Sequence, residues 1–227
     1  DLERYHLQPL DVDAEIANLL GALGNLRGNR KLEVTLMPGR TVLSNELEKQ
    51  WEREGYKVER GVETSLDNIT RLLTHDKGYH ILHFLGHGHF SRRGRNEALF
   101  FEGKDGQVDV VRDDDLVMQI GAVEPQPYLI FLAACETAKR DPENGNPFVG
   151  LAPKLVKAGV PAVVAMQDRV PIVTAQSLTR DFYRYLLEHG IVDLAMNQAR
   201  LLLFDRQETS WAIPVLFMRM RDGRLFV

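Results

Sequence analysis

The stretch that decides the fold is LIFLAACETA, residues 129–138. Four consecutive apolar residues are followed by two alanines and then by Cys135. An apolar run too short for a typical helix predicts a strand that is buried on both faces of a sheet. Ligands of open α/β sheets bind at the carboxyl ends of the strands, so this strand is expected to deliver Cys135 to such an edge. Cys135 is the only cysteine of the chain, and its chemistry is therefore that of a free thiol.

A second buried strand is predicted in YHILHFLGHGHF, residues 79–90. Its apolar residues precede Gly86-His87-Gly88, where two glycines permit a close approach to the backbone. His87 is thus also expected at the end of a strand. If the two strands are parallel neighbours, His87 and Cys135 emerge at the same edge of the sheet. They are 48 residues apart, close to the roughly 50-residue spacing from histidine to cysteine in caspases.

Two further segments extend the pattern: NPFVGLAPKLVKAGVPAVVAMQ at 146–167 and SWAIPVLFMRMRDGRLF at 210–226. With HFLGHG and LAACETA, in this order, they resemble the CHAT domain, a branch of the caspase and separase peptidase clan. The resemblance covers most of the chain from residue 79 onward. It implies an α/β fold, a caspase-like three-layer α/β/α sandwich with a mostly parallel central sheet. A chain of 227 residues can bury one sizeable core, so a single domain over residues 1–227 is expected.

The first 78 residues fit the family pattern least. CHAT-like chains usually have a strand before the segment that resembles DLERYHLQPLDVDAEI. That strand either precedes Asp1 or is replaced by KLEVTLM, residues 31–37. The chain opens without methionine, and we expect a fragment of a larger protein with further domains beside it.

Hydrophobic periodicity and turn residues predict the remaining elements. We expect helices over 13–23, 44–55, 64–73, 113–120, 148–158, 174–187 and 192–203. We expect strands over 56–62, 160–166 and 211–220, and a short hairpin strand in ALFF at 98–101. Strands that alternate with helices indicate an α/β sandwich.

The resemblance implies a cysteine endopeptidase that cleaves protein substrates through an acyl-enzyme on Cys135. His87 would act as general base and acid, and the backbone N–H groups of Gly88 and Cys135 would bind the oxyanion. No acid near His87 in the sequence is a candidate to orient it, so a Cys-His dyad is predicted. The alternative is a catalytically silent interaction module of the same fold, which would be expected to have lost the histidine or the cysteine.

Four closely spaced histidines allow a zinc interpretation: His80, His83, His87 and His89. Structural zinc needs four converging ligands, whereas the glycines break this strand and Cys135 is the only thiolate. We therefore predict no metal, and expect His83 to be packed and hydrogen-bonded beneath the site. An unrelated α/β hydrolase would carry a G-x-S-x-G elbow, and none is present. No P-loop or dinucleotide fingerprint follows a strand, so no cofactor is predicted.

Substrate selection is expected at Asp168 and Arg169, which follow the strand VPAVVAM. In the clan, the chain that leaves this strand lines the first specificity pocket, with arginine in caspases and aspartate in separases. Arg169 would select an acidic P1 residue, and Asp168 would select Lys or Arg. One residue of register decides between them, because side chains alternate along a strand. The sequence favours Arg169 slightly.

Composition limits the partners. A net charge of −4 does not indicate binding to nucleic acid or to an anionic membrane. No apolar run reaches the ~18 residues of a membrane span. A single cysteine fits a reducing cytoplasm. CHAT-like domains commonly sit in bacterial proteins beside sensor or repeat modules, so regulation by such partners is expected. Turn formers fill residues 139–147, and the isolated domain is therefore expected to be poorly active.

Overall fold

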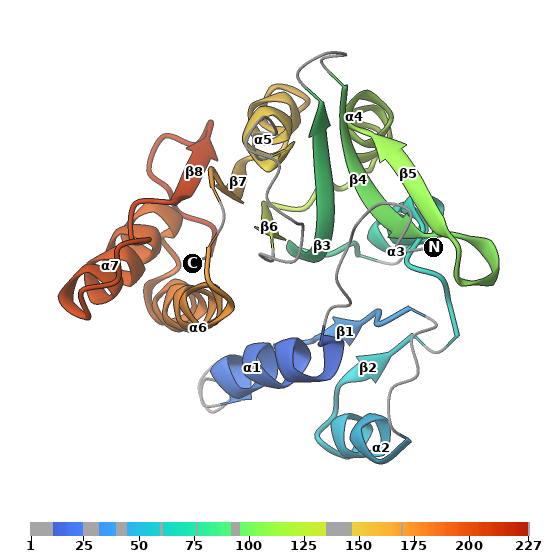
Figure 1. The fold of residues 1–227 in the computed structure, drawn as a ribbon, viewed down its shortest axis with the longest axis horizontal. Helices are drawn as coiled ribbons and strands as arrows, with labels where there is room; N and C mark the ends of the chain where they lie inside the picture. The colour runs from blue at the N-terminus through green and yellow to red at the C-terminus, as the bar shows by residue number, and fades with distance from the viewer. Residues whose placement is uncertain are drawn as a thin grey trace.

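The computed structural model describes residues 11–24, 32–39, 45–59, 61–75, 77–91, 96–134, 147–168 and 170–226. Its centre is a six-stranded sheet in the order β5-β4-β3-β6-β7-β8 (Figure 1). The strands are β3 (Ile81–Ser91), β4 (Asn96–Glu102), β5 (Val108–Arg112), β6 (Leu129–Ala134), β7 (Ala162–Met166) and β8 (Pro214–Met218). Helices alternate with the later strands, which confirms the predicted α/β class.

The sheet is mixed. Its central strands β3, β6 and β7 are parallel, whereas β4 is antiparallel to β3, β5 to β4 and β8 to β7. Antiparallel neighbours can be joined by short connections, as in the β3–β4–β5 meander, while parallel neighbours need a crossover. Helix α5 (Pro147–Lys157) supplies the crossover from β6 to β7. The parallel pairing expected from the sequence is thus found at the centre of the sheet and not toward its edges.

Helices cover both faces of the sheet. On one face lie α1 (Val12–Gly24), α6 (Ile172–His189) and α7 (Val192–Asp205), and on the other α3 (Leu66–Thr74), α4 (Asp113–Gly121) and α5. Along β6, Leu129 and Phe131 belong to the α6/α7 core, and Ile130 and Leu132 to the α3/α4/α5 core. Successive strand residues point to opposite faces. A strand covered on both sides therefore needs the uninterrupted apolar run seen in the sequence.

A second, two-stranded parallel sheet lies beside the first. It pairs β1 (Thr35–Leu36) with β2 (Lys57–Val58), next to α2 (Asn45–Arg53). Trp51 is buried in its small core. Within the described residues, the 31–37 segment pairs with β2 and with no strand of the six-stranded sheet. The Thr35 hydroxyl lies 2.9 Å from that of Tyr79, just ahead of β3, and links the two sheets.

The predicted helices are all present within a few residues of their expected ends. Strand β5 was not predicted. None of the helices in the described part of the chain combines the length and the apolar character that crossing a bilayer requires.

Candidate active site

Strand β3 changes partner in the middle of the candidate site. Residues Ile81 to Gly86 pair in parallel with β6, and the last pair is Gly86 with Ala134. From His87 to Ser91 the strand pairs antiparallel with β4, and His87 lies opposite Phe100. The prediction that His87 ends its strand is therefore wrong. The strand continues because His87 to Ser91 pair with β4, which lies on the opposite edge of β3 from β6.

His87 is the first residue of the hairpin part of β3. The residue is buried, with 8% of its surface exposed. Gly88 follows, partly buried, opposite Leu99 of β4. The backbone of His87 is paired with β4, and that of the preceding Gly86 is paired with β6. His87 is thus a well-positioned candidate for proton transfer.

Gly86 permits a close approach, as the sequence predicted. A Cβ atom built on Gly86 would lie 2.5 Å from Cζ of Phe84, two residues earlier on the same face of the strand. The Phe84 ring packs against that of Phe101 on β4, with 5.2 Å between ring centroids. The glycine therefore gives space to an aromatic ring beneath the α3/α4/α5 face, next to the point where β3 changes partner.

His83 is held by aromatic neighbours. Its ring stacks on Phe131 of β6, with 4.8 Å between centroids and 17° between planes. Its Nδ1 lies 2.9 Å from the Tyr183 hydroxyl of α6, and the tautomer decides which atom donates. The residue keeps some accessible surface, but dense packing around the ring lowers the pKa of His83 to about 4. The imidazole is neutral at physiological pH, as expected for a packed, hydrogen-bonded histidine.

Tyr183 was not anticipated. Burial raises the pKa of its phenol, so the hydroxyl keeps its proton. A tyrosine within the buried stripe of α6 indicates a hydrogen-bond partner, because buried phenols usually find one. The sequence does not show that this partner is His83, which lies 100 residues away.

The remaining histidines do not assemble a described metal site. His80 is exposed and its ring contacts those of Tyr128 and Phe226, at 5.4 and 6.2 Å between centroids. The side chain of His89 is outside the described set. Among the side chains that the structure describes, no group of three His, Cys, Asp or Glu is arranged to hold a metal ion.

Asp168 follows β7 and is exposed. Its neighbour Gln167 continues the pairing with β8, because the Gln167 N–H donates to Ile213 O at 3.0 Å. The Gln167 side chain also donates to Ala212 O at 2.7 Å. Two predicted site residues, Cys135 and Arg169, lie outside the described residues. The structure thus places His87, Gly88 and Asp168 of the predicted set.

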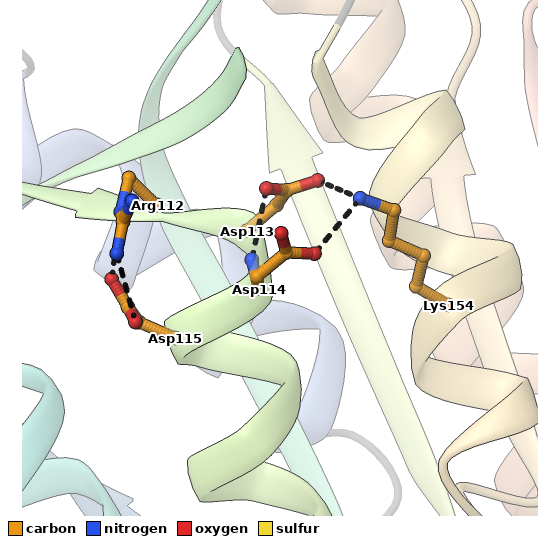
Figure 2. Close-up of polar contacts among 5 residues, drawn as sticks. All are labelled: Arg112, Asp113, Asp114, Asp115 and Lys154. Carbon is orange, nitrogen blue, oxygen red and sulfur yellow. Dashed lines mark hydrogen bonds and ion pairs between the residues drawn. The ribbon is translucent and has the colours of Figure 1, made fainter. Parts of the chain in front are cut away.

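An ionic cluster fixes the helix that follows the 135–146 segment. Figure 2 shows Lys154 of α5 bridging Asp113 and Asp114 at the start of α4. Asp113 is only 5% exposed and also accepts a hydrogen bond from the Asp114 N–H at 2.8 Å. The hydrogen bond to Asp113 is the main cause that raises the pKa of Lys154. Helix α4 begins at Asp113, as predicted, but the link of its acidic residues to α5 was not foreseen.

A family model described as the CHAT domain matches residues 14–220. A search of curated proteins found no match.

Proposed function

Because the chain belongs to the CHAT domain family, we propose that it is a caspase-like cysteine endopeptidase with Cys135 as nucleophile and His87 as general base and acid. The family lies in a caspase-like peptidase clan. The helices on both faces of the sheet are consistent with the three-layer sandwich proposed for this chain. The proposal includes regulation by neighbouring sensor or repeat modules.

The register between β3 and β6 carries the proposal. Every pair in this register joins residues 48 positions apart, from Ile81 with Leu129 to Gly86 with Ala134. His87 and Cys135 are also 48 positions apart. One further step of the same register would therefore set them directly opposite each other, on strands about 4.8 Å apart. Their side chains would share the α6/α7 face, because Ala133 belongs to that core and residues two apart point the same way.

The chemistry follows from these positions. His87 would take the thiol proton, and the Cys135 sulfur would attack the scissile carbonyl carbon. The tetrahedral intermediate would collapse to a thioester as His87 protonates the leaving amine. A water molecule, deprotonated by His87, would then release the acid.

The oxyanion would be stabilised by backbone N–H groups. Successive N–H groups of a strand point to opposite sides, so one of His87 and Gly88 directs its N–H toward the β6 side. We assign this role to Gly88, together with the N–H of Cys135. A donor aimed at the developing charge is typically worth ~10²–10³ in kcat.

Register also bears on substrate selection. In the β6–β7 pairing, residues 33 positions apart are opposite, as Leu132 is to Ala165. Continued to the end of the strands, this register would bring Asp168 opposite Cys135. Asp168 has the parity of Val164 and Met166, which belong to the α6/α7 core. This favours Asp168 over Arg169, and with it Lys or Arg at P1.

The sole cysteine allows a test that needs no substrate. The rate of alkylation of Cys135 by iodoacetamide is measured against pH, since only the thiolate reacts. A free thiol has a pKa of about 8.5, and a histidine partner lowers it. We expect the midpoint well below that value in the wild type and a return toward it in His87→Ala. His80→Ala, at an exposed histidine, is the matched control.

Cleavage is tested with a peptide library on the protein joined to its natural flanking regions. We expect turnover that Cys135→Ala abolishes, with Lys or Arg preferred at P1. Asp168→Asn should lower kcat/KM for basic substrates by about tenfold or more, and Arg169→Gln should not. An acidic preference that only Arg169→Gln removes would reverse the assignment of the P1 residue. An unperturbed thiol and no cleavage would favour the silent interaction module.

A further inference from the structure

The loop between α7 and β8 runs beside the proposed specificity segment. The β7–β8 pairing ends with Met166 opposite Pro214, and the Gln167 backbone extends it to Ile213. The Gln167 side chain holds the next carbonyl, that of Ala212. Ala212 therefore lies beside Asp168, on the far side of β7 from β6. The residue before it is Trp211.

The course of this loop is fixed by hydrogen bonds at its start. Gln207 adopts a left-handed conformation, with φ of 60°, and the Glu208 N–H donates to Leu203 O at 3.0 Å. The Thr174 hydroxyl donates to the Glu208 carboxylate at 3.0 Å. Thr174 is 2% exposed and lies in the first turn of α6, directly after the 167–171 segment. The loop is thus joined to the first turn of α6 at its start and to Gln167, directly after β7, at its end.

An aromatic pair formed by this loop and the last turn of α7 faces solvent. Trp211 is 41% exposed and Phe204, on the last turn of α7, is 57% exposed. Their rings meet edge to face, with 5.6 Å between centroids and 82° between planes. Helix α7 covers the same face of the sheet to which Asp168 is assigned by strand alternation. Rigid exposed aromatic side chains next to a binding site are well suited to recognise apolar groups.

We propose that Phe204 and Trp211 form a second specificity pocket, which takes a large apolar side chain within the three residues before P1 of the substrate. This inference rests on the proposed endopeptidase function. The substrate class is then an extended peptide with an apolar side chain a short distance ahead of the P1 residue. An extended chain advances about 3.3 Å per residue, and adjacent strands are about 4.8 Å apart. A peptide whose P1 carbonyl lies at Cys135 can therefore extend across β7 to β8 within those three residues.

The first measurement is a library that varies the three positions before P1. We expect the wild type to prefer large apolar residues at one of them. Trp211→Ala and Phe204→Ala should each lower kcat/KM for the preferred peptides by about tenfold, with the P1 preference unchanged. Met118→Ala is the control, because Met118 is 67% exposed on α4, on the other side of the sheet. Equal profiles in all four proteins would overturn the proposal.

The second measurement separates this pocket from catalysis. The chain has two tryptophans, and Trp51 is 2% exposed. In a Cys135→Ala, Trp51→Phe protein, fluorescence comes from Trp211 alone and peptides bind without being cleaved. Acetylated tetrapeptide amides with Leu or Phe ahead of P1 should protect Trp211 from acrylamide quenching, and glycine-substituted ones should not.

The outcomes are distinguishable. Cleavage with a P1 preference but no protection of Trp211 would remove the second pocket and leave the endopeptidase. Absence of both cleavage and peptide binding would remove the proposed function itself. The remaining possibility is that Phe204 and Trp211 form a self-association surface, which sedimentation of the wild type and of Trp211→Ala tests. If the wild type is an oligomer that Trp211→Ala dissociates, and the cleavage profile does not change, the proposal is overturned.

Discussion

The Tyr183 hydroxyl lies 2.9 Å from Nδ1 of His83, inside the core between α6 and the sheet. It is a polar contact among aromatic rings, since Phe131 stacks on His83 and Phe182 packs edge to face on Tyr183. Helix α6 follows the proposed specificity segment directly, so this contact sets where α6 rests on β3. Buried polar pairs of this kind specify one docking geometry more than they add stability.

Tyr183→Phe should destabilise the fold by about 1–3 kcal/mol, because it leaves the His83 nitrogen buried without its partner. The midpoint of urea unfolding measures the loss. Tyr185→Phe is the control, on the same helix and only partly buried. A Tyr183→Phe protein as stable as the control would mean that water replaces the lost hydroxyl.

Stability should rise with pH between about 4 and 6.5, because the pKa of His83 is lowered to about 4 in the folded protein from 6.5. In this window the unfolded chain binds a proton at His83 that the folded chain does not, which favours unfolding at the lower pH. The full effect is of order 3 kcal/mol. Unfolding measured across this range in His83→Gln should show a correspondingly flatter dependence. An unchanged slope would assign the dependence to other groups.

Gly86→Ala should both destabilise the protein and disturb the candidate site. The new methyl group would meet the Phe84 ring at 2.5 Å, and overpacking typically costs about 1–3 kcal/mol. The expected signs are a lower unfolding midpoint and a changed alkylation profile of Cys135. Gly86→Ala combined with Phe84→Leu should recover part of the stability.

Gly21→Ala is the matched control for the glycine prediction. Gly21 is exposed in the middle of α1, and a methyl group added there would have no neighbouring atom within 4 Å. Alanine there should stabilise the protein by about 0.5–1 kcal/mol through helix propensity. Destabilisation at both positions would show that the effect at Gly86 is not specific to the Phe84 ring.

Lys154→Met should destabilise the packing of α5 against α4. It keeps the aliphatic stem but leaves the Asp113 carboxylate, 5% exposed, without its cation. An expected loss of about 1–2 kcal/mol allows for the partial exposure of Lys154. Arg112→Met removes an exposed ion pair with Asp115 at 3.1 Å and should have no measurable effect. If Lys154→Met behaves like Arg112→Met, the ion pair between Lys154 and Asp113 does not stabilise the packing of α5 against α4.

Much of the fold could be predicted because the local pattern of apolar residues in the sequence agrees with the burial of those residues in the structure. The apolar run in β6 reflects a strand covered on two faces, and the 48-residue spacing of His87 and Cys135 equals the β3–β6 register offset. Strand β5 was not predicted because it is an edge strand in which Val111 is the only buried residue. Its apolar signal is correspondingly weak.

Other features depend on distant parts of the chain. The continuation of β3 beyond His87 follows from pairing with β4, whereas the glycines on either side of His87 indicated a break. The contact of His83 with Tyr183 joins residues 100 positions apart. The sequence predicts that His83 is packed and hydrogen-bonded, but only the packing of α6 on the sheet brings it to Tyr183.

The change of partner at Gly86 and His87 places the imidazole where the parallel and the antiparallel parts of the sheet meet. Residues up to Gly86 pair with β6, and His87 to Ser91 pair with β4 on the opposite edge of β3. The backbone position of His87 therefore depends on two strands that are distant from each other in the sequence, and a substitution in β4 at Phe100, its direct partner, acts on the imidazole without altering β6.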